Sequence, residues 1–361
     1  MLPGAPAAES LETYRRQARG LFYRKADVGV TDAVLQRLPE DKARFGAEAE
    51  AQIAAVAAEA LGTRSTTASF VPDAGTFHAL FRLGSPDGDR WYARTSVPSL
   101  GLPALGFAVE MAASHAAAAR GVPTARIVHV DLSRRHLPVD LQIAQEASGT
   151  PLGRDASPDV LEALGRTIAR LHAIRCSGFG PLDPEVPPGD GPLRGLRTSW
   201  PEFVRTNLDE HVAHCRRLGA LSPTDAAFAT TCLRDAALLT TESVLLHGDL
   251  ANPNVLVEGA QVHALLDWED ALAGDPVFDL ACWGTFVGNH ERRAAMLRGY
   301  RSVTTLPDDF EFRYWLYHLR IMLAKTVHRS RFGYVATDRI PAGDRLRPAL
   351  TALRDLTRGH A

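Results

Sequence analysis

The chain has 361 residues, which is more than one typical domain needs, so we expect two lobes or one domain with helical additions. Hydrophobic residues make up 45% and charged residues 23%, as in ordinary globular proteins. The 40 basic and 42 acidic side chains leave a net charge of −2, which argues against nucleic acid or an anionic membrane as a partner. The four cysteines form no CxxC pair, and we expect reduced, packed thiols.

Residues 1–45 are interpreted as an accessory segment. They are polar, with scattered Pro, Gly and charged residues around a possible helix at residues 11–21, and the sequence assigns them no role. The opening residues lack the charged-then-apolar pattern of a secretion signal. The alanine-rich stretch at residues 51–61 is interrupted by Gln52 and Glu59, so it predicts a helix and not a membrane span. A cytoplasmic location is the resulting expectation.

Residues 46–147 predict an N-terminal α+β lobe. A helix is expected at residues 48–61, where it stops at Gly62. Alternating patterns predict strands at residues 77–83 and 91–96, joined by a turn. A helix at residues 106–120, closed by Gly121, separates them from two short strands at residues 126–130 and 139–144. Strands around one long helix are typical of an α+β arrangement.

Residues 148–361 predict a larger, mainly helical lobe. Ser157 and Pro158 suit the N-cap and first turn of a helix. A Gly- and Pro-rich loop at residues 177–195 is too long for a tight connection, which suggests a functional role. Further helices are expected at residues 200–218 and 223–240, then a hairpin turning at residues 258–260, and helices after residue 279.

The segment HGDLANPNVLVEGAQVHALLDWE at residues 247–269 carries the candidate chemistry. Asp249 and Asn254 lie five positions apart, and Asp267 follows the predicted hairpin. Asp249 could orient a hydroxyl group and accept its proton, while Asn254 and Asp267 could supply oxygen ligands to Mg²⁺ beside a nucleoside triphosphate. The spacing matches a kinase catalytic loop followed by a metal-binding aspartate.

These ordered elements resemble those of the aminoglycoside phosphotransferase family, kinase-like enzymes that phosphorylate small molecules. The resemblance implies a two-lobed, protein-kinase-like α+β fold with a small antiparallel-sheet N-lobe and a larger helical C-lobe. It implies ATP or GTP and Mg²⁺ as cofactors, with Asp249 as the catalytic base and Asn254 and Asp267 as metal ligands. It would also place Asp279 in a segment that anchors the catalytic loop. For Asp275 and Asp279, however, we favour the simpler interpretation that they cap the following helix.

The resemblance also implies where the N-terminal lobe holds the nucleotide. Gly75 and Thr76 fall in the phosphate-covering turn, although an ordinary turn is the alternative for residues 72–76. Arg94 stands at the strand position where kinases usually carry lysine, and Glu110 is its natural ion-pair partner. At the hinge between the lobes, the residues expected to hold adenine through backbone groups are Gln145 and Ala147.

Two other interpretations of the central motif stay open. His247, Asp249 and His263 could form the facial triad of a non-haem iron enzyme, although the flanking segments are helical. We favour a structural role for His247, holding the loop by packing and hydrogen bonds. A catalytically inactive nucleotide-binding module is the other alternative, and the intact set of Asp249, Asn254 and Asp267 argues against it.

The acceptor is expected to be a hydroxyl-bearing small molecule. Residues 177–182 and 198–204 look similar to hygromycin kinases, which favours an antibiotic; a metabolic kinase of a sugar, choline-like or amino-alcohol compound is the alternative. Cationic aminoglycosides generally require an acidic cleft. The balanced charge, with His328, Arg329 and Arg331 in the last third, fits a less cationic acceptor such as a nucleoside or a sugar-decorated antibiotic. Core packing, rather than lining of the cleft, is expected for four aromatic residues, Trp200, Phe203, Trp283 and Trp315.

Overall fold

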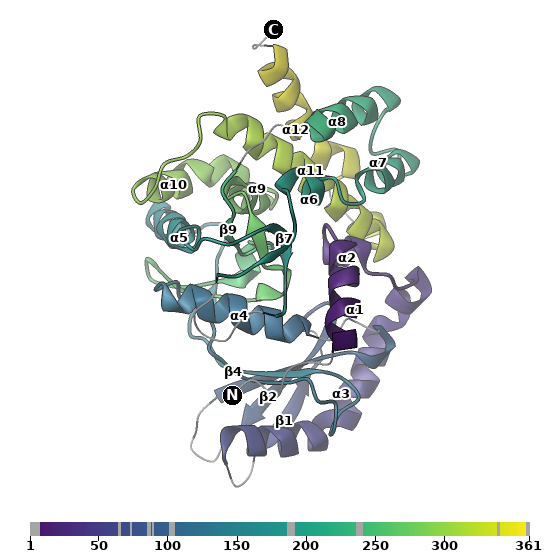
Figure 1. The fold of residues 1–361 in the computed structure, drawn as a ribbon, viewed down its shortest axis with the longest axis vertical. Helices are drawn as coiled ribbons and strands as arrows, with labels where there is room; N and C mark the ends of the chain where they lie inside the picture. The colour runs from purple at the N-terminus through teal and green to yellow at the C-terminus, as the bar shows by residue number, and fades with distance from the viewer. Residues whose placement is uncertain are drawn as a thin grey trace.

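The computed structural model shows a smaller sheet-based lobe and a larger helical lobe (Figure 1). Residues of both lobes line a cleft. It describes residues 8–63, 66–72, 74–84, 88, 90–100, 105–185, 192–235, 241–337 and 340–358. The predicted two-lobed α+β architecture is therefore confirmed.

The smaller lobe is built on a five-stranded antiparallel sheet in the order β1-β2-β3-β5-β4. Its strands are β1 (Thr67–Val71), β2 (His78–Gly84), β3 (Arg90–Ser96), β4 (Ile127–Asp131) and β5 (Leu141–Gln145). The last four agree with the predicted strands to within two residues at each end, and β1 is an additional strand. Side chains alternate between faces, so Phe81 is buried while His78 and Leu80 face the cleft.

One face of this sheet is covered by α3 (Asp32–Leu61), which runs through the predicted boundary between residues 45 and 46. The accessory segment is therefore continuous with the small lobe. Pro39 and Gly46 interrupt the local helical signal, but tertiary contacts hold the helix together. A Cβ on Gly46 would lie 2.5 Å from the Phe70 ring, so this glycine lets the helix approach the sheet closely. The helix ends at Gly62, as predicted, in the left-handed conformation with φ +65°.

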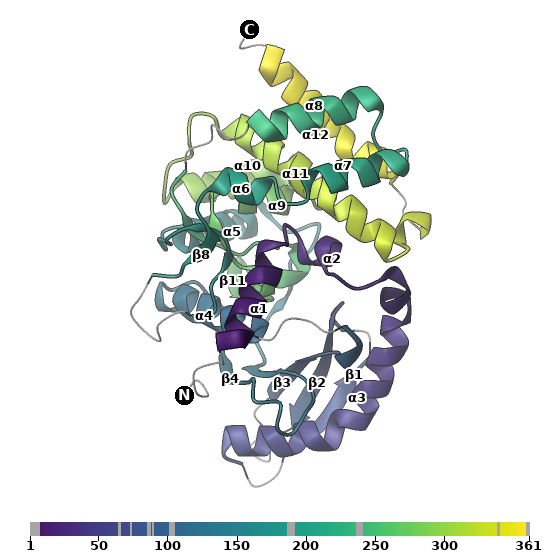
Figure 2. The same cartoon turned by 45° about the vertical axis from the view of Figure 1, so that its right-hand side comes forward.

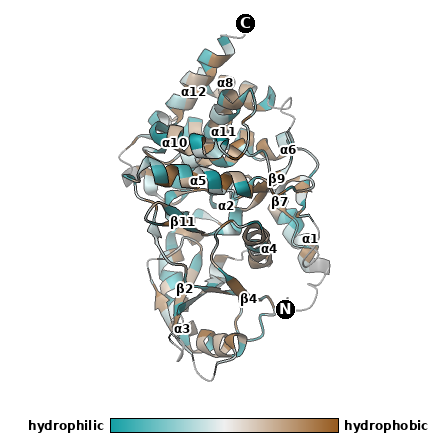
Figure 3. Cartoon of the chain, turned by 90° about the vertical axis from the view of Figure 1, so that its left-hand side faces the viewer, coloured by the Kyte–Doolittle hydropathy of each residue, from teal (hydrophilic) through white to brown (hydrophobic). Residues whose placement is uncertain are grey.

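The other face of the sheet meets α4 (Gly106–Ala119), which lies between the sheet and the large lobe (Figures 1 and 2). Phe107 packs with Ile127 and Val130 of the small lobe, whereas Val109 and Ala113 join the core of the large lobe. The mostly apolar sequence of α4 colours it brown in Figure 3. This helix therefore shares its apolar surface between the two lobes.

The larger lobe contains two small sheets in the orders β11-β10-β6 and β8-β7-β12-β9. Their strands are β6 (Thr150–Pro151), β7 (Phe179–Leu182), β8 (Gly195–Arg197), β9 (Val244–Leu246), β10 (Val255–Glu258), β11 (Gln261–Leu265) and β12 (Leu272–Gly274). The helices are α5 (Pro158–Leu171), α6 (Trp200–Val204), α7 (Leu208–Arg217), α8 (Pro223–Asp235), α9 (Val277–Gly284), α10 (Asn289–Arg301), α11 (Phe310–Arg331) and α12 (Ala342–Arg358). Short 3-10 turns lie at Pro98–Leu100, Asn252–Asn254, Trp268–Asp270 and Tyr334–Thr337.

Several local predictions for this lobe are confirmed and two need correction. Ser157 caps α5, accepting a hydrogen bond from the Val160 N–H, and the hairpin β10–β11 turns where expected. The helix predicted at residues 200–218 is instead two helices, because Asn207 adopts a left-handed conformation with φ 55° between α6 and α7. The predicted loop at residues 177–195 contains the strand β7, which pairs with β12.

The accessory segment forms α1 (Ala8–Arg19) and α2 (Arg24–Asp27), which lie between the lobes (Figures 1 and 2). The residues of α1 contact β7 and β8, and α2 packs against α11. Arg331 of α11 donates hydrogen bonds to the carbonyl oxygens of Ala26 at 2.6 Å and Val28 at 3.0 Å. This segment is therefore part of the packed structure.

The four cysteines are free thiols, and all except the partly exposed Cys176 are buried, as expected.

Trp200, Phe203 and Trp283 are fully buried, and the partly buried Trp315 packs against the core of the large lobe, so core packing is confirmed for these aromatic residues. Within the described ranges, no helix combines the length and the apolar character that crossing a membrane would require.

Candidate active site

Asp279 anchors the loop that follows β9. Its carboxylate accepts hydrogen bonds from the backbone N–H of His247 at 2.7 Å and of Gly248 at 2.9 Å, and it lies 3.2 Å from Nε2 of His172. Burial opposes ionisation, but the hydrogen bond from His172 and the nearby histidines lower the pKa of Asp279. Our preferred interpretation of Asp279 as a helix cap is therefore wrong, because three donors outside the helix hold its carboxylate. Asp275 does cap α9, accepting from the Val277 N–H at 2.9 Å.

Asp279→Ala is expected to destabilise the protein by roughly 3–5 kcal/mol, because it leaves two buried N–H groups and a buried imidazole without their acceptor. Thermal unfolding measures the effect as a drop in Tm. The exposed Asp209, which pairs with Arg234 at the surface, provides the control variant Asp209→Ala. An equal Tm for the two variants would contradict the anchoring role.

The carboxylate of Asp249 lies between two lysines at the floor of the cleft. Lys25 Nζ is 3.0 Å from one carboxylate oxygen and Lys325 Nζ is 3.9 Å from the other. Burial alone would raise its pKa, but the two ammonium charges outweigh burial and lower the pKa of Asp249 to about 2. The group is therefore ionised at neutral pH and can accept a hydrogen bond from a hydroxyl group.

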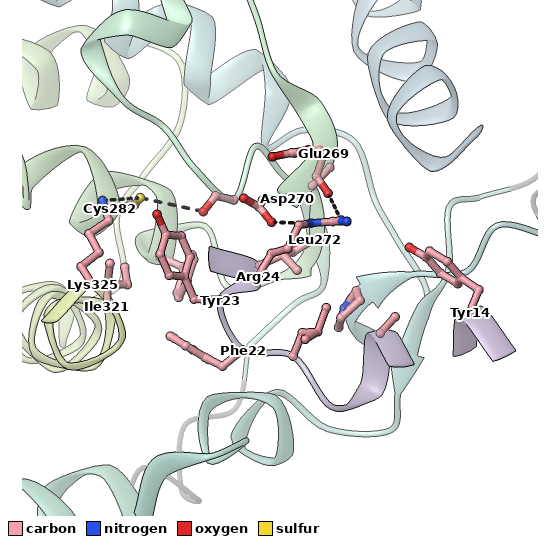
Figure 4. A pocket seen from close by; sticks show the side chains of 16 residues that line it. Tyr14, Phe22, Tyr23, Arg24, Glu269, Asp270, Leu272, Cys282, Ile321 and Lys325 are labelled. Carbon is pink, nitrogen blue, oxygen red and sulfur yellow. Dashed lines mark hydrogen bonds and ion pairs between the residues drawn. The ribbon is translucent and has the colours of Figure 1, made fainter. Parts of the chain in front are cut away.

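Lys25 was not predicted as a site residue, since it belongs to the accessory segment. Burial opposes its protonation, but the charge of Asp249 raises the pKa of Lys25 well above its ordinary value. The neighbouring Arg24 pairs with Asp270 at 3.4 Å and donates to the Glu269 carbonyl oxygen at 2.7 Å (Figure 4). The segment is thus fastened directly beside the candidate catalytic loop.

One compositional signal could have identified these lysines. The chain has only three lysines among its 40 basic residues, namely Lys25, Lys42 and Lys325. Two of them flank Asp249, and the third holds the turn before β2. The ammonium group of lysine is a compact point charge on a flexible stem, whereas the guanidinium group of arginine, which the chain uses at its other basic positions, is a wide planar fork.

Asn254 and Asp267 line the cleft near Asp249. The Asn254 side-chain amide donates from Nδ2 to the Asp249 carbonyl oxygen at 3.0 Å, so its amide oxygen is the atom that could bind a metal ion. Asp267, two residues after the end of β11, adopts a left-handed conformation with φ 64°, which is unusual for a residue with a side chain. An amide oxygen and a carboxylate are hard oxygen donors and suit Mg²⁺.

The arrangement of the histidines contradicts an iron triad. His247 Nε2 lies 2.8 Å from the Leu266 carbonyl oxygen, and its ring packs against Trp268, which confirms a structural role. His263 lies instead beside Ser148, at 3.2 Å. Across the residues that the structure describes, no three His, Cys, Asp or Glu side chains are grouped to hold a metal ion.

Arg94 is the centre of an ion-pair network that joins the lobes. It contacts Glu110 of α4 at 2.9 Å and Asp267 at 3.1 Å, and Glu269 lies 3.7 Å away. The predicted pairing of Arg94 and Glu110 is thus present. Glu110 also accepts from the Trp268 N–H at 3.3 Å, and His78 approaches Glu269 at 3.3 Å.

Burial and the neighbouring charges together set the pKa values of the residues in this network. Burial opposes the positive charge of Arg94, but the surrounding carboxylates raise its pKa. Burial also raises the pKa of Glu110 to about 7, and Asp267 and Glu269 act in the same direction against the effect of Arg94. The network thus contains three carboxylates around one guanidinium, an arrangement in which a further cation would be stabilised.

Arg94→Ala is expected to raise the apparent ATP requirement and lower turnover, with Arg94→Lys milder. Glu110→Ala should act in the same direction, because Arg94 would lose its buried partner. In a double-mutant cycle we expect a coupling of about 0.5–3 kcal/mol, since both changes disable one unit. The cycle is read from kcat/KM for ATP. Full additivity would show that the two side chains act separately.

The turn between β1 and β2 is held from behind by the buried Lys42. Its ammonium donates to the carbonyl oxygens of Ala74 at 2.9 Å and Gly75 at 2.8 Å. Gly75 has φ +68°, a conformation that a side chain would disfavour, and both Gly75 and Thr76 line the cleft. With its carbonyl groups engaged behind it, this turn is suited to present N–H groups to a phosphate.

The cleft itself has a volume of about 710 Å³ and is lined by residues of both lobes. Gln145 and Ala147, the residues predicted at the hinge, are not among the described residues that line it. The backbone N–H of Gln145 donates to the Arg126 carbonyl oxygen at 2.8 Å and is therefore already engaged. Leu80, Phe286 and Met322 contribute to its apolar lining.

Comparison with known proteins identifies the family. Residues 69–353 match the phosphotransferase enzyme family, so the chain belongs to this family. It is 32% identical over 155 residues to hygromycin-B 4-O-kinase of Escherichia coli, covering 42% of this chain and 41% of the relative. It is also 32% identical over 149 residues to viomycin phosphotransferase of Streptomyces vinaceus, covering 39% and 48%. The chain thus spans less than half the length of either curated relative.

The fold is similar to that of solved phosphotransferase structures. The crystal structure of aminoglycoside phosphotransferase APH(4)-Ia matches with a TM-score of 0.61 and 20% identity, covering 84% of this chain and 98% of that one. This agreement confirms the predicted kinase-like fold.

Proposed function

We propose that the protein is an ATP-dependent O-phosphotransferase that modifies a hydroxyl group of a small molecule in the cytoplasm. The observation that carries this proposal is the convergence of Asp249, Asn254, Asp267 and Arg94 on one cleft between the lobes. The leading acceptor is an antibiotic, because the curated relatives are named as a hygromycin-B kinase and a viomycin phosphotransferase. GTP is an alternative phosphoryl donor.

In the proposed reaction, Asp249 accepts a hydrogen bond from the acceptor hydroxyl and takes its proton. The oxygen forms a bond to the terminal phosphorus as the bond to the nucleoside diphosphate breaks. Lys25 and Lys325 keep Asp249 ionised and oriented, while Arg94 and the turn at Gly75 and Thr76 position the phosphates.

Asn254 and Asp267 would hold Mg²⁺, which supplies charge neutralisation to the phosphates when bound. We further propose that the nucleotide base lies toward the hinge. Because the N–H of Gln145 is engaged, a backbone N–H donated to the base would have to come from Ala147.

The test is a screen of hydroxyl compounds with ATP and Mg²⁺, read by mass spectrometry as the gain of one phosphoryl group. Wild-type protein should modify at least one acceptor, and Asp249→Asn should not. ATP binding with no acceptor modified across the screen would instead support an inactive nucleotide-binding module.

A metabolic kinase is the second candidate. Lys25 and Lys325 both line the cleft and flank the single carboxylate of Asp249. This lining favours a sugar over a choline-like or amino-alcohol acceptor, since like charges repel.

A further inference from the structure

We propose that Lys25, in the accessory segment, is a catalytic residue that donates hydrogen bonds to the phosphoryl group during its transfer. This inference rests on the proposed function, because it adds a residue to the same reaction. Lys25 precedes the part of the chain that matches the family, which begins at residue 69. The accessory segment thus adds a contact of its own to the motifs that the chain shares with its family.

The ammonium group of Lys25 retains hydrogen-bonding capacity beside the cleft. An ammonium group has three N–H donors. Of the residues that the structure describes, only Asp249 accepts a hydrogen bond from Lys25, at 3.0 Å. The Lys25 side chain is 14% exposed and lines the cleft together with Gly75 and Thr76. Two of its N–H donors are therefore available to a ligand in the cleft.

Lys325, the other lysine beside Asp249, is more fully engaged by the protein itself. Its ammonium donates to the Thr285 hydroxyl at 2.9 Å and lies 4.3 Å from the centre of the Phe286 ring. It is also further from the Asp249 carboxylate than Lys25 is, at 3.9 Å against 3.0 Å. Lys325 is therefore suited to support Asp249, whereas Lys25 is suited to contact a ligand as well.

The distances around Asp249 bring the phosphoryl group within reach of Lys25. A hydroxyl that gives its proton to Asp249 lies about 2.6–3.2 Å from a carboxylate oxygen, and its oxygen lies about 3–3.5 Å from the phosphorus before transfer. The phosphorus is then no more than about 7 Å from that carboxylate oxygen. Because Lys25 Nζ is 3.0 Å from the same carboxylate, an oxygen of the phosphoryl group can approach it to hydrogen-bond distance.

The transfer itself requires a positive charge at this position. Negative charge spreads over the oxygens of the phosphoryl group while the bond from the acceptor oxygen to phosphorus forms and the bond to the nucleoside diphosphate breaks. The proton of the acceptor passes to Asp249, and Lys25 keeps its own protons throughout. Arg94 already faces three carboxylates, so the ammonium of Lys25 supplies a donor that those carboxylates do not occupy.

Contacts on both sides of Lys25 hold it in position before a substrate binds. Arg24 donates to the Glu269 carbonyl oxygen at 2.7 Å, and Arg331 donates to the Ala26 carbonyl oxygen at 2.6 Å. The backbone of Lys25 is therefore fastened to the loop after β11 and to α11. A charge that is already in place needs little reorganisation as the reaction proceeds, which makes it effective in stabilising a transition state.

Nucleotide affinities of the full chain test the contact, because AMP-PNP carries a terminal phosphoryl group that ADP lacks. We expect Lys25→Met to weaken Mg·AMP-PNP binding about tenfold and Mg·ADP binding less than about twofold, as measured by titration calorimetry. Arg16→Met is the matched control, since it removes an exposed positive charge from the same segment and should alter neither affinity. Equal weakening of the two nucleotides, or no weakening of either, would overturn the proposal.

The Asp249→Asn background separates a direct contact from simple compensation of charge. If Lys25 only offset the negative charge of Asp249, removing Lys25 in this background would leave Mg·AMP-PNP affinity unchanged. We expect the tenfold loss to persist when Lys25→Met/Asp249→Asn is compared with Asp249→Asn. Its disappearance would rule out the contact. The same background replaces the single variant if Lys25→Met unfolds at a lower temperature, because it leaves no carboxylate that has lost its partner.

Turnover provides a second measurement, made with an acceptor that the screen identifies. Lys25→Met is expected to lower kcat by about 10²–10³-fold, and Lys25→Arg should recover part of this loss because it restores a cation with N–H donors. A kcat for Lys25→Met near or above the wild-type value would show that Lys25 does not assist the transfer. Failure of the wild-type protein to bind Mg·AMP-PNP would instead contradict the proposed function itself.

Discussion

Asp249→Asn is expected to lower kcat by roughly 10²–10⁴-fold while the affinity for Mg·ATP stays nearly unchanged. The asparagine keeps the shape of the side chain but cannot take the proton of the acceptor hydroxyl. Asp249 contacts Lys25 and Lys325, whereas Arg94, which we propose positions the phosphates, is held by Glu110, Asp267 and Glu269. The loss should therefore appear in turnover and not in nucleotide binding.

Two controls separate chemistry from folding in the Asp249 experiment. Asp249→Asn removes the negative charge between Lys25 and Lys325, and an unpaired buried charge destabilises the fold. Tm must therefore be measured together with kcat. Asp209→Asn changes an exposed acid of the same lobe and should alter neither quantity. Turnover by Asp249→Asn near the wild-type rate would remove Asp249 from the catalytic role.

Asp267→Ala is expected to lower activity by at least about 100-fold, and to weaken nucleotide affinity only when Mg²⁺ is present. The proposed role of Asp267 is to hold the ion that bridges the phosphates, and without Mg²⁺ that role disappears. Arg94 would still be held by Glu110 at 2.9 Å in the variant, so the metal-free nucleotide contact should survive.

Fluorescence titration of a nucleotide analogue with Mg²⁺ and with EDTA measures both affinities for Asp267→Ala. Asp209→Ala, in the same assay, controls for the loss of an acidic side chain. An equal loss of affinity in the two buffers would indicate a distorted site and not a lost metal ligand.

The accessory segment contributes a lysine to the cleft beside Asp249. Its α2 helix places Lys25 against Asp249, and Arg331 of α11 holds the carbonyl groups that follow α2. A segment to which the sequence assigns no role therefore lines the proposed acceptor end. The same segment encloses a small space of about 40 Å³ between Phe22, Arg24 and the loop at Asp270 (Figure 4).

The sequence by itself determined the order of the motifs and most of the regular structure. Strands β2 and β3 were predictable because apolar side chains alternate when one face of a sheet is buried. The ends of α4 and α5 were predictable from local signals, Gly121 after the first and Ser157 before the second. The spacing of Asp249, Asn254 and Asp267 is also local, since one loop and one hairpin contain all three residues.

Only the tertiary structure decided which distant charges meet. Lys25 reaches Asp249 across 224 positions of sequence, and the partners of Asp279 lie 31 or more positions away. No periodicity encodes such contacts, because they depend on how whole helices pack. For the same reason, the full length of α3 was not predictable. Its proline and glycine weaken the local helical signal, but packing against the sheet maintains the helix. The net charge of −2 likewise does not reveal that Lys25 of α2 and Lys325 of α11 meet at Asp249 in one cleft, because only folding brings these helices together.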